Sequence, residues 1–261
     1  MRYARTLLRL WSSSLAAELE YRTNFVLAAV TSAGTLGGAI FSLGLFYQNG
    51  HRLGGWTWSE VLLVIGFYTI LEGVQATFLT PNFQRFSEYV KDGNLDFVLL
   101  KPMDAQFYLS FRNVSVWGLP NLFLGVGVIG WAGANHDPPL SAANYAAGVL
   151  PIALGTIVLY SISFALGTLT IWFVKLWNVT IALRSVLEAG RYPVPAYPRA
   201  YRIVLTFVVP VLFLTTIPAQ AMLGTARVPW LVATGGLAFA LLAGSRALWR
   251  FALRYYTGAS S

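Results

Sequence analysis

The chain has 261 residues, of which 56% are hydrophobic and 11% are charged, and its formal net charge is +8. Soluble domains carry roughly a quarter of charged residues, so this composition indicates a membrane protein and excludes a soluble domain of ordinary size. The chain has no cysteine, which excludes disulfides and cysteine metal sites. The two histidines, His51 and His136, fall between apolar segments, so we expect no histidine metal site either.

Residues 1–23 predict an amphipathic helix in the membrane interface. Leu7, Trp11 and Leu15 share one helical face, and Arg9 lies on the other. A solvated stub ahead of the first span is the alternative. After this segment, apolar runs predict an all-α integral membrane protein with six spans. The spans are expected at about 25–47, 59–79, 106–131, 145–174, 203–217 and 230–251.

Two of these regions carry features that disturb a straight helix. The third span contains Arg112, Asn113 and Pro120, so we expect a kink there. The segment 218–229 is too apolar for a simple loop and too short to cross a bilayer, which favours a re-entrant segment. Its marker residues are Pro218, Gly224 and Pro229.

The distribution of Lys and Arg predicts the orientation. With both termini on one side, all but two of the 18 basic residues fall on that side, in the terminal segments, in 80–104, at Arg112 and in the proline-rich loop 175–202. The exceptions are Arg52 and Arg227. The positive-inside rule therefore places both termini and both basic loops in the cytoplasm. Anionic lipid accounts for the net charge, so we expect no nucleic acid partner.

Residues 80–104 form the most polar run between two apolar segments. Pro81 can open a helix, Phe83 and Phe86 recur at helical spacing, and Gly93 is the type of residue that ends a helix in a left-handed cap. We expect a short amphipathic helix that serves as a docking element at the membrane surface. Asp104 is placed to cap the helix that follows.

No motif in the chain predicts an enzyme. A Walker A sequence is absent because no lysine follows a glycine, so the chain does not hydrolyse ATP alone. Gly125–Gly130 matches GxGxxG, but it lies inside the third span, where helix packing is the better interpretation. The hydrolase motif GxSxG and the metalloprotease motif HExxH are also absent.

Two ionisable residues lie within predicted spans at comparable heights. Glu72 belongs to the second span and Arg112 to the third, and they could form an intramembrane ion pair. Such a pair can mark a transport pathway or can fix the packing of two helices. We favour the packing role.

The run Gly93–Pro102, GNLDFVLLKP, resembles the G-x-L-D-x-x-L-L-[KR]-P signature of a branch of ABC-2 type transporter permeases. A second block also resembles this branch, and the resemblance extends over essentially the whole chain. The second block consists of Arg191, Tyr192, Pro193, Tyr197, Pro198, Arg202, Pro210, Pro218 and Ala219.

The resemblance implies a six-span half-transporter in a bacterial cytoplasmic (inner) membrane. Two such subunits, identical or related, would surround a path for export, and separate ABC ATPase subunits would hold ATP and Mg²⁺, leaving this chain without a cofactor. The resemblance further implies that 80–104 carries the coupling helix that enters a groove on the ATPase, with Phe86 and Tyr89 as hypothetical anchors. The expected coupling residues are Phe83, Arg85, Phe86, Glu88, Tyr89, Val90, Lys91, Asp92, Gly93 and Asp96.

The substrate is open at this stage. The apolar, aromatic and hydroxyl-bearing spans suit an amphipathic or hydrophobic molecule. A stand-alone secondary transporter or channel is the main alternative, with its site at Glu72 and the broken helix near Pro210 to Pro229. Few ionisable groups in the spans count against it, and a membrane-embedded transferase lacks a candidate catalytic group.

Overall fold

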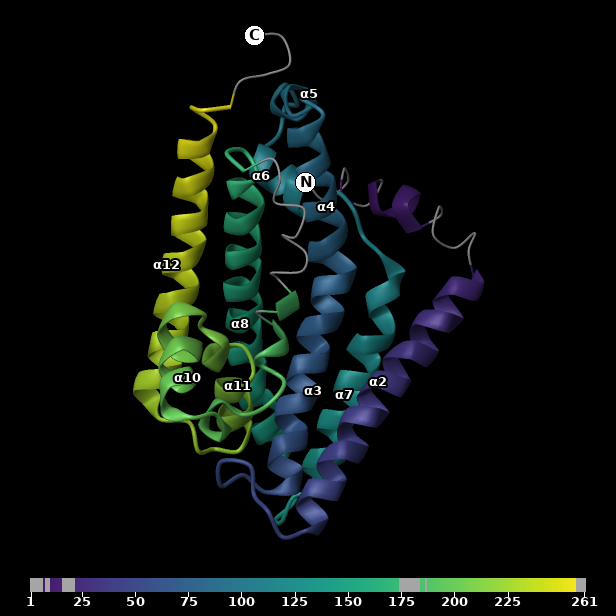
Figure 1. The fold of residues 1–261 in the computed structure, drawn as a ribbon, viewed down its shortest axis with the longest axis vertical. Coiled ribbons are helices and arrows are strands. Elements are labelled where there is room, and N and C mark those ends of the chain that lie inside the picture. Colours follow the sequence, from purple (N-terminus) through teal and green to yellow (C-terminus); the bar gives the residue numbers. More distant parts are fainter. Residues whose placement is uncertain (1–6, 8–9, 16–21, 174–183, 186, 257–261) are drawn as a thin grey trace.

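The computed structural model describes residues 7, 10–15, 22–173, 184–185 and 187–256. Regular structure in these residues is helical, apart from one bridge between Leu53 and Trp56. Of the predicted interface helix at 1–23, only residues 7 and 10–15 and the start of α2 lie inside the described ranges. The α-helices labelled in Figure 1 or discussed below are α2 (Arg22–Gln48), α3 (Trp58–Val74), α4 (Thr80–Lys91), α5 (Asp96–Leu99), α6 (Ala105–Phe111), α7 (Leu119–Ala134), α8 (Ala142–Leu169), α10 (Arg199–Ile203), α11 (Thr216–Met222) and α12 (Val228–Ala252).

The long helices run along one axis of the molecule (Figure 1). α5 and the last turn of α12 lie at one end, which we call the α5 end. The loop that joins α2 to α3 lies at the opposite end, which we call the loop end. The connection from α7 to α8 also lies at the loop end.

Among the residues that the structure describes, five helices are long and apolar enough to cross a membrane, which confirms the predicted all-α membrane fold class. They are Thr23–Gln48, Trp58–Lys91, Val116–Ala134, Ala142–Leu169 and Val228–Ala252. A sixth crossing would consist of two pieces, Arg199–Val208 and Val211–Met222, bent by 74°. The span expected at 203–217 is therefore not one continuous helix. Val209 is extended at the break and Pro210, which has no N–H to continue a helix, follows it.

α3 and α4 form one helical run of 34 residues, Trp58–Lys91. Thr57 and Glu60 form a capping box at its start, in which Glu60 accepts a hydrogen bond from the Thr57 backbone N–H at 2.7 Å. A π-helical turn, Gln75–Leu79, absorbs the entry of Pro81, so the helix continues past the proline. The separate short helix expected after the second span is thus an extension of that span.

The third predicted span is broken rather than kinked. α6 ends at Phe111, and a regular helix resumes only at Val116. Backbone groups that the break leaves without helical partners are hydrogen-bonded within the protein. Buried Asn82 donates to the Asn113 carbonyl at 2.7 Å and accepts from the Asn113 N–H at 2.9 Å. Trp11 donates its indole N–H to the Phe111 carbonyl at 2.7 Å. Irregular backbone at membrane depth is tolerated when it is satisfied in this way.

α3 and α7 pack closely because glycines line their contact. A Cβ added at Gly66 would lie 2.5 Å from Ile129, and one added at Gly125 would lie 2.8 Å from the Gly66 carbonyl oxygen. Gly127 and Gly130 have no atom within 4 Å of such a Cβ. The packing interpretation of the Gly125–Gly130 motif is therefore correct for its first glycine, and the other two face away from the protein interior.

The described part of 175–202 does not stay at one surface, as the predicted cytoplasmic loop would. Arg191 lies beside Tyr68, in the middle of α3. Pro195 and Ala196 pack against Gly54, which has φ +61 and belongs to the α2–α3 loop at the loop end. The chain thus passes through the interior of the bundle before α10. Arg199 and Arg202 consequently lie toward the loop end, whereas the sequence analysis placed them on the same side as residues 80–104.

Candidate functional site

The structure separates Glu72 from Arg112. Arg112 donates to the hydroxyl of Tyr89 and stacks over the ring of Tyr108 at 5.3 Å. Tyr89 is 17 residues beyond Glu72 on the same helical run, a rise of about 25 Å. The predicted Glu72–Arg112 pair is therefore wrong. Sequence reasoning placed Arg112 in a continuous third span, whereas it lies in the break near the α5 end.

Glu72 instead faces two arginines of the segment that passes through the bundle. Arg191 and Arg184 both lie near enough to interact electrostatically with its carboxylate. Glu72 and Arg184 line two adjoining cavities of about 330 and 460 Å³, and Arg191 lines the smaller one. We call them together the Glu72 groove. They share Tyr68, Glu72, Ala76, Trp117 and Arg184.

Arg191 is held in place within this groove. Its guanidinium lies 5.0 Å from the centre of the Tyr68 ring and donates to the Tyr68 hydroxyl at 3.1 Å. Stacking and a hydrogen bond together fix the plane of the guanidinium. The backbone that carries Arg191 is tied down next to it, since Thr215 donates to the Gly190 carbonyl at 2.7 Å.

Phe83, an expected coupling residue, and Phe86, one of the two predicted anchors, do not face outward. They are 2% and 0% exposed, and both pack against Phe164 of α8. Phe86 also meets Trp249 of α12 edge to face at 5.5 Å between ring centres. Both residues hold α4 to the bundle, so neither is available for direct contact with a partner. Tyr89 and Val90 are partly buried against the same cluster.

α5 and its C-cap form an exposed apolar surface at the α5 end. Phe97 is 68% exposed and Leu100 is 81% exposed, with Leu99 beside them. Leu95 and Val98 are buried, so the segment divides into an inner and an outer face. We call the outer residues Phe97, Leu99 and Leu100 the α5 patch. Exposed charged residues on and just after α4 are Arg85, Glu88, Lys91 and Asp92.

The turn that presents the α5 patch has the predicted cap. Gly93 has φ +70, and the Asn94 N–H donates to the Tyr89 carbonyl at 2.9 Å, the bond expected of a Schellman motif. Asp104 accepts from the Phe107 N–H at 2.9 Å and so caps α6 as predicted. Sequence reasoning missed the α5 patch itself. Its signal was five apolar residues in a six-residue turn, too many for one buried face.

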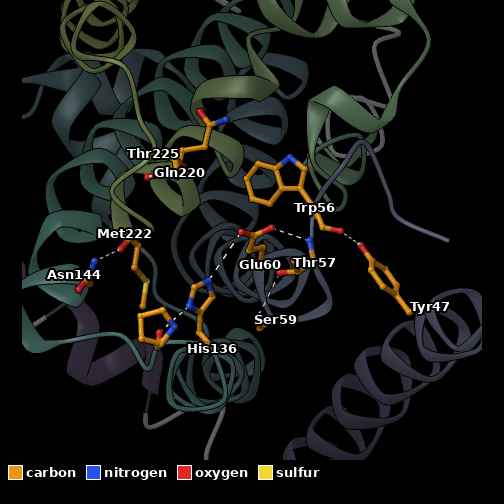
Figure 2. A network of polar contacts seen from close by, with 11 residues as sticks. Tyr47, Trp56, Thr57, Ser59, Glu60, His136, Asn144, Gln220, Met222 and Thr225 are labelled. Atoms are coloured by element: carbon orange, nitrogen blue, oxygen red, sulfur yellow. Dashed lines mark hydrogen bonds and ion pairs between the residues drawn. The ribbon is translucent and has the colours of Figure 1, made fainter. Parts of the chain in front are cut away.

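A polar network fastens the helices together at the loop end. Figure 2 shows the Glu60 carboxylate between the Thr57 N–H and the ring of His136, whose Nε2 lies 4.0 Å from it. Asn144 donates to the Met222 carbonyl at 2.8 Å and thereby joins α8 to the end of α11. The described residues contain no group of three potential metal ligands.

The residues of the predicted re-entrant segment connect α11 to α12. Pro218 lies inside α11, Gly224 follows that helix with φ +70, and Pro229 lies in the first turn of α12. α11 packs on α8: a Cβ added at Gly148 would lie 3.4 Å from Met222. This segment lies in the loop-end half of the molecule (Figure 1).

These features define a multi-pass membrane protein in which a long helix joins an internal charged groove to an exposed apolar patch at one end. The chain belongs to the ABC-2 transporter family, because the model of the ABC-2 family transporter protein matches residues 33–260. The family supplies the transmembrane component of ABC transporters, which associates with ABC ATPase subunits and is not itself catalytic. No curated protein and no solved structure matches the chain.

Proposed function

We propose that the chain is an export permease for an amphipathic substrate, driven by ABC ATPase subunits that bind at the α5 end. The observation that carries this proposal is the single helical run Trp58–Lys91. It holds Glu72 in its middle and leads directly into the turn that presents the α5 patch. A force applied at that patch therefore acts on the element that lines the internal groove.

The length of this run indicates which part leaves the membrane. Thirty-four helical residues span about 51 Å, against about 30 Å for the hydrocarbon core. Trp58 lies at the loop end, is partly exposed and is suited to the membrane interface, whereas Trp56 is buried. Counting from there, the charged helix α4 projects from the bilayer with α5 beyond it. An apolar patch exposed to water at that position is typical of a binding surface.

The basic residues support a cytoplasmic location of the α5 end. Lys101, Arg250 and Arg254 lie there, together with the charged residues of α4. Placing Arg199 and Arg202 toward the loop end reduces the predicted charge bias and leaves its direction unchanged. We therefore propose a bacterial cytoplasmic membrane protein with both termini in the cytoplasm. A second permease subunit, identical or related, would complete the transport path.

Affinity purification from the native cell in mild detergent tests the proposal. The wild-type chain should bring down an ABC ATPase and any second permease, and the complex should hydrolyse ATP. The double variant Phe97→Ser, Leu100→Ser should lose most of the ATPase. Tyr255→Ser is the matched control, because Tyr255 is also an exposed aromatic residue at the α5 end. Recovery of this chain alone, in several detergents, would contradict the proposal and favour a stand-alone transporter.

A further inference from the structure

The Glu72 groove follows the long helix over much of its length. Its first cavity lies between α2 and α3, from Leu36 and Ile65 to Glu72. Its second cavity continues beside the start of α4 as far as Gln84. α2 diverges from α3 away from the loop end (Figure 1).

Among the residues that line the two cavities, Arg184 and Arg191 carry positive charge and Glu72 carries negative charge. Glu188 is also near enough to act on Glu72, but it lines neither cavity. Among the described residues no ion pair within 4.0 Å joins Glu72 to either arginine. The guanidinium groups therefore retain donors for an anion, and Arg191 is already oriented by Tyr68. A guanidinium at a fixed orientation is the side chain best suited to phosphate or carboxylate.

The α2 side of the groove combines polar and apolar surface. Thr31, Ser32 and Thr35 supply hydroxyl groups next to the charged cluster. Leu36 and Ala39 continue the same face with apolar side chains. A ligand that satisfies the whole surface must carry an anionic group and an apolar body.

We propose that the Glu72 groove binds an anionic amphiphile, with its phosphate or carboxylate head at Arg184 and Arg191. The apolar part of the ligand lies along α2. Glu72 competes with the head group for the arginines, which keeps the bound anion releasable. The proposal rests on the proposed function only in treating this ligand as the transported substrate.

Native mass spectrometry of the purified chain, titrated with dioleoyl phosphatidic acid, tests the site. Dioleoyl phosphatidylcholine, which has the same chains and a zwitterionic head, should bind at least about tenfold more weakly. Arg191→Gln should weaken phosphatidic acid binding about tenfold. Glu72→Gln should strengthen it, because it removes the competing carboxylate. Arg254→Gln, an exposed site at the α5 end, should leave it unchanged.

The opposite signs of Glu72→Gln and Arg191→Gln separate a binding role from a structural one. Weaker binding in both variants would overturn the proposal, as would equal binding of the two lipids or equal effects of Arg191→Gln and Arg254→Gln. Inorganic phosphate should bind more weakly than phosphatidic acid, and equal affinity would overturn the assignment to an amphiphile. If Arg191→Gln does not fold, Arg184→Gln replaces it, since the Arg184 side chain is exposed.

The lipid titration needs no ATPase, so it can fail independently of the proposed function. Phosphatidic acid binding with the predicted variant pattern, in a chain that recovers no ATPase, would support the site and contradict the ATP-driven role. Recovery of an active ATPase complex without selective lipid binding would do the reverse. The two proposals therefore have separate tests.

Discussion

Arg246 on α12 forms a bidentate ion pair with the carboxylate of Asp104, the residue that caps α6. One guanidinium nitrogen lies 3.0 Å from Asp104 Oδ1, and the second contacts Oδ2. The first nitrogen also donates to Gln106 at 3.0 Å. Hydrogen bonding to Arg246, aided by the Phe107 N–H, lowers the pKa of Asp104 below its ordinary value despite partial burial. The contact fastens α6, which follows the α5 turn, to the last transmembrane helix.

Asp104→Asn should reveal this contact as a pH-dependent loss of stability. A carboxyl whose pKa is lower in the folded state stabilises the fold above its unfolded pKa, and this contribution is lost as the pH falls through the folded pKa. Asparagine retains the helix cap. Because both side chains are about a third exposed, the loss at pH 7 should be about 1 kcal/mol or less, a few degrees in Tm at most.

Thermal unfolding in detergent from pH 7 to pH 3 measures this effect. The wild-type and Asp104→Asn curves should differ at pH 7 and converge at the acid end. Asp92→Asn, at an exposed position after α4, should follow the wild type throughout. A pH-independent gap for Asp104→Asn would show that the charge contact contributes nothing.

Alanine substitution should lower stability at Gly125, which lies in the α3–α7 contact, much more than at Gly127 of the same motif. Gly125→Ala forces a Cβ to 2.8 Å from the Gly66 backbone oxygen, so it should destabilise the fold by about 1–3 kcal/mol. Gly127→Ala adds the same methyl group where no atom lies within 4 Å, and its effect should be within about 0.5 kcal/mol. Equal Tm shifts for the two variants would contradict the packing described.

Alanine substitution should lower stability at Phe86 and should weaken ATPase binding at Leu100. Phe86→Ala opens a cavity between α4, α8 and α12 and should cost about 3–5 kcal/mol. Leu100→Ala removes an exposed side chain and should leave Tm nearly unchanged, while it weakens ATPase binding. A normal Tm for Phe86→Ala would contradict the burial of Phe86 and would favour its predicted contact with the ATPase.

Local signals in the sequence were sufficient for several elements. The apolar runs predicted six spans, because a bilayer demands about 20 apolar residues per crossing, and five long apolar helices overlap them in the described residues. The Gly93 and Asp104 caps followed from residue type and spacing alone. These features depend on neighbours along the chain, which a sequence displays directly.

The predictions were wrong where tertiary contacts determine the partner of a side chain or the course of the backbone. An amphipathic pattern identifies a buried face without naming its partner, so Phe83 and Phe86 were assigned to an ATPase instead of to Phe164 and Trp249. Glu72 was paired with Arg112 because the break in the third span, stabilised by Asn82, was not visible. The passage of Arg191 into the bundle was also hidden, since its basic, proline-rich neighbours are typical of a surface loop.

The proposed orientation predicts the sidedness of two exposed loops. The chain has no cysteine, so single-cysteine variants can be labelled without background. A membrane-impermeant maleimide applied to intact cells with a permeabilised outer membrane should label Arg52→Cys. It should label Lys101→Cys only after cell lysis. The reverse pattern would place the α5 end outside the cell and remove it as an ATPase site.

Cysteine cross-linking at the α5 patch tests the central claim most directly. Leu100→Cys should form a cross-link to the co-purifying ABC ATPase with a short bifunctional reagent, and the yield should change when ATP is added, because closure of the ATPases moves the α5 end. Tyr255→Cys, exposed at the same end and outside the patch, should give little cross-link. An ATPase that cross-links equally well through both positions, or that never cross-links at Leu100, would contradict docking at the α5 patch.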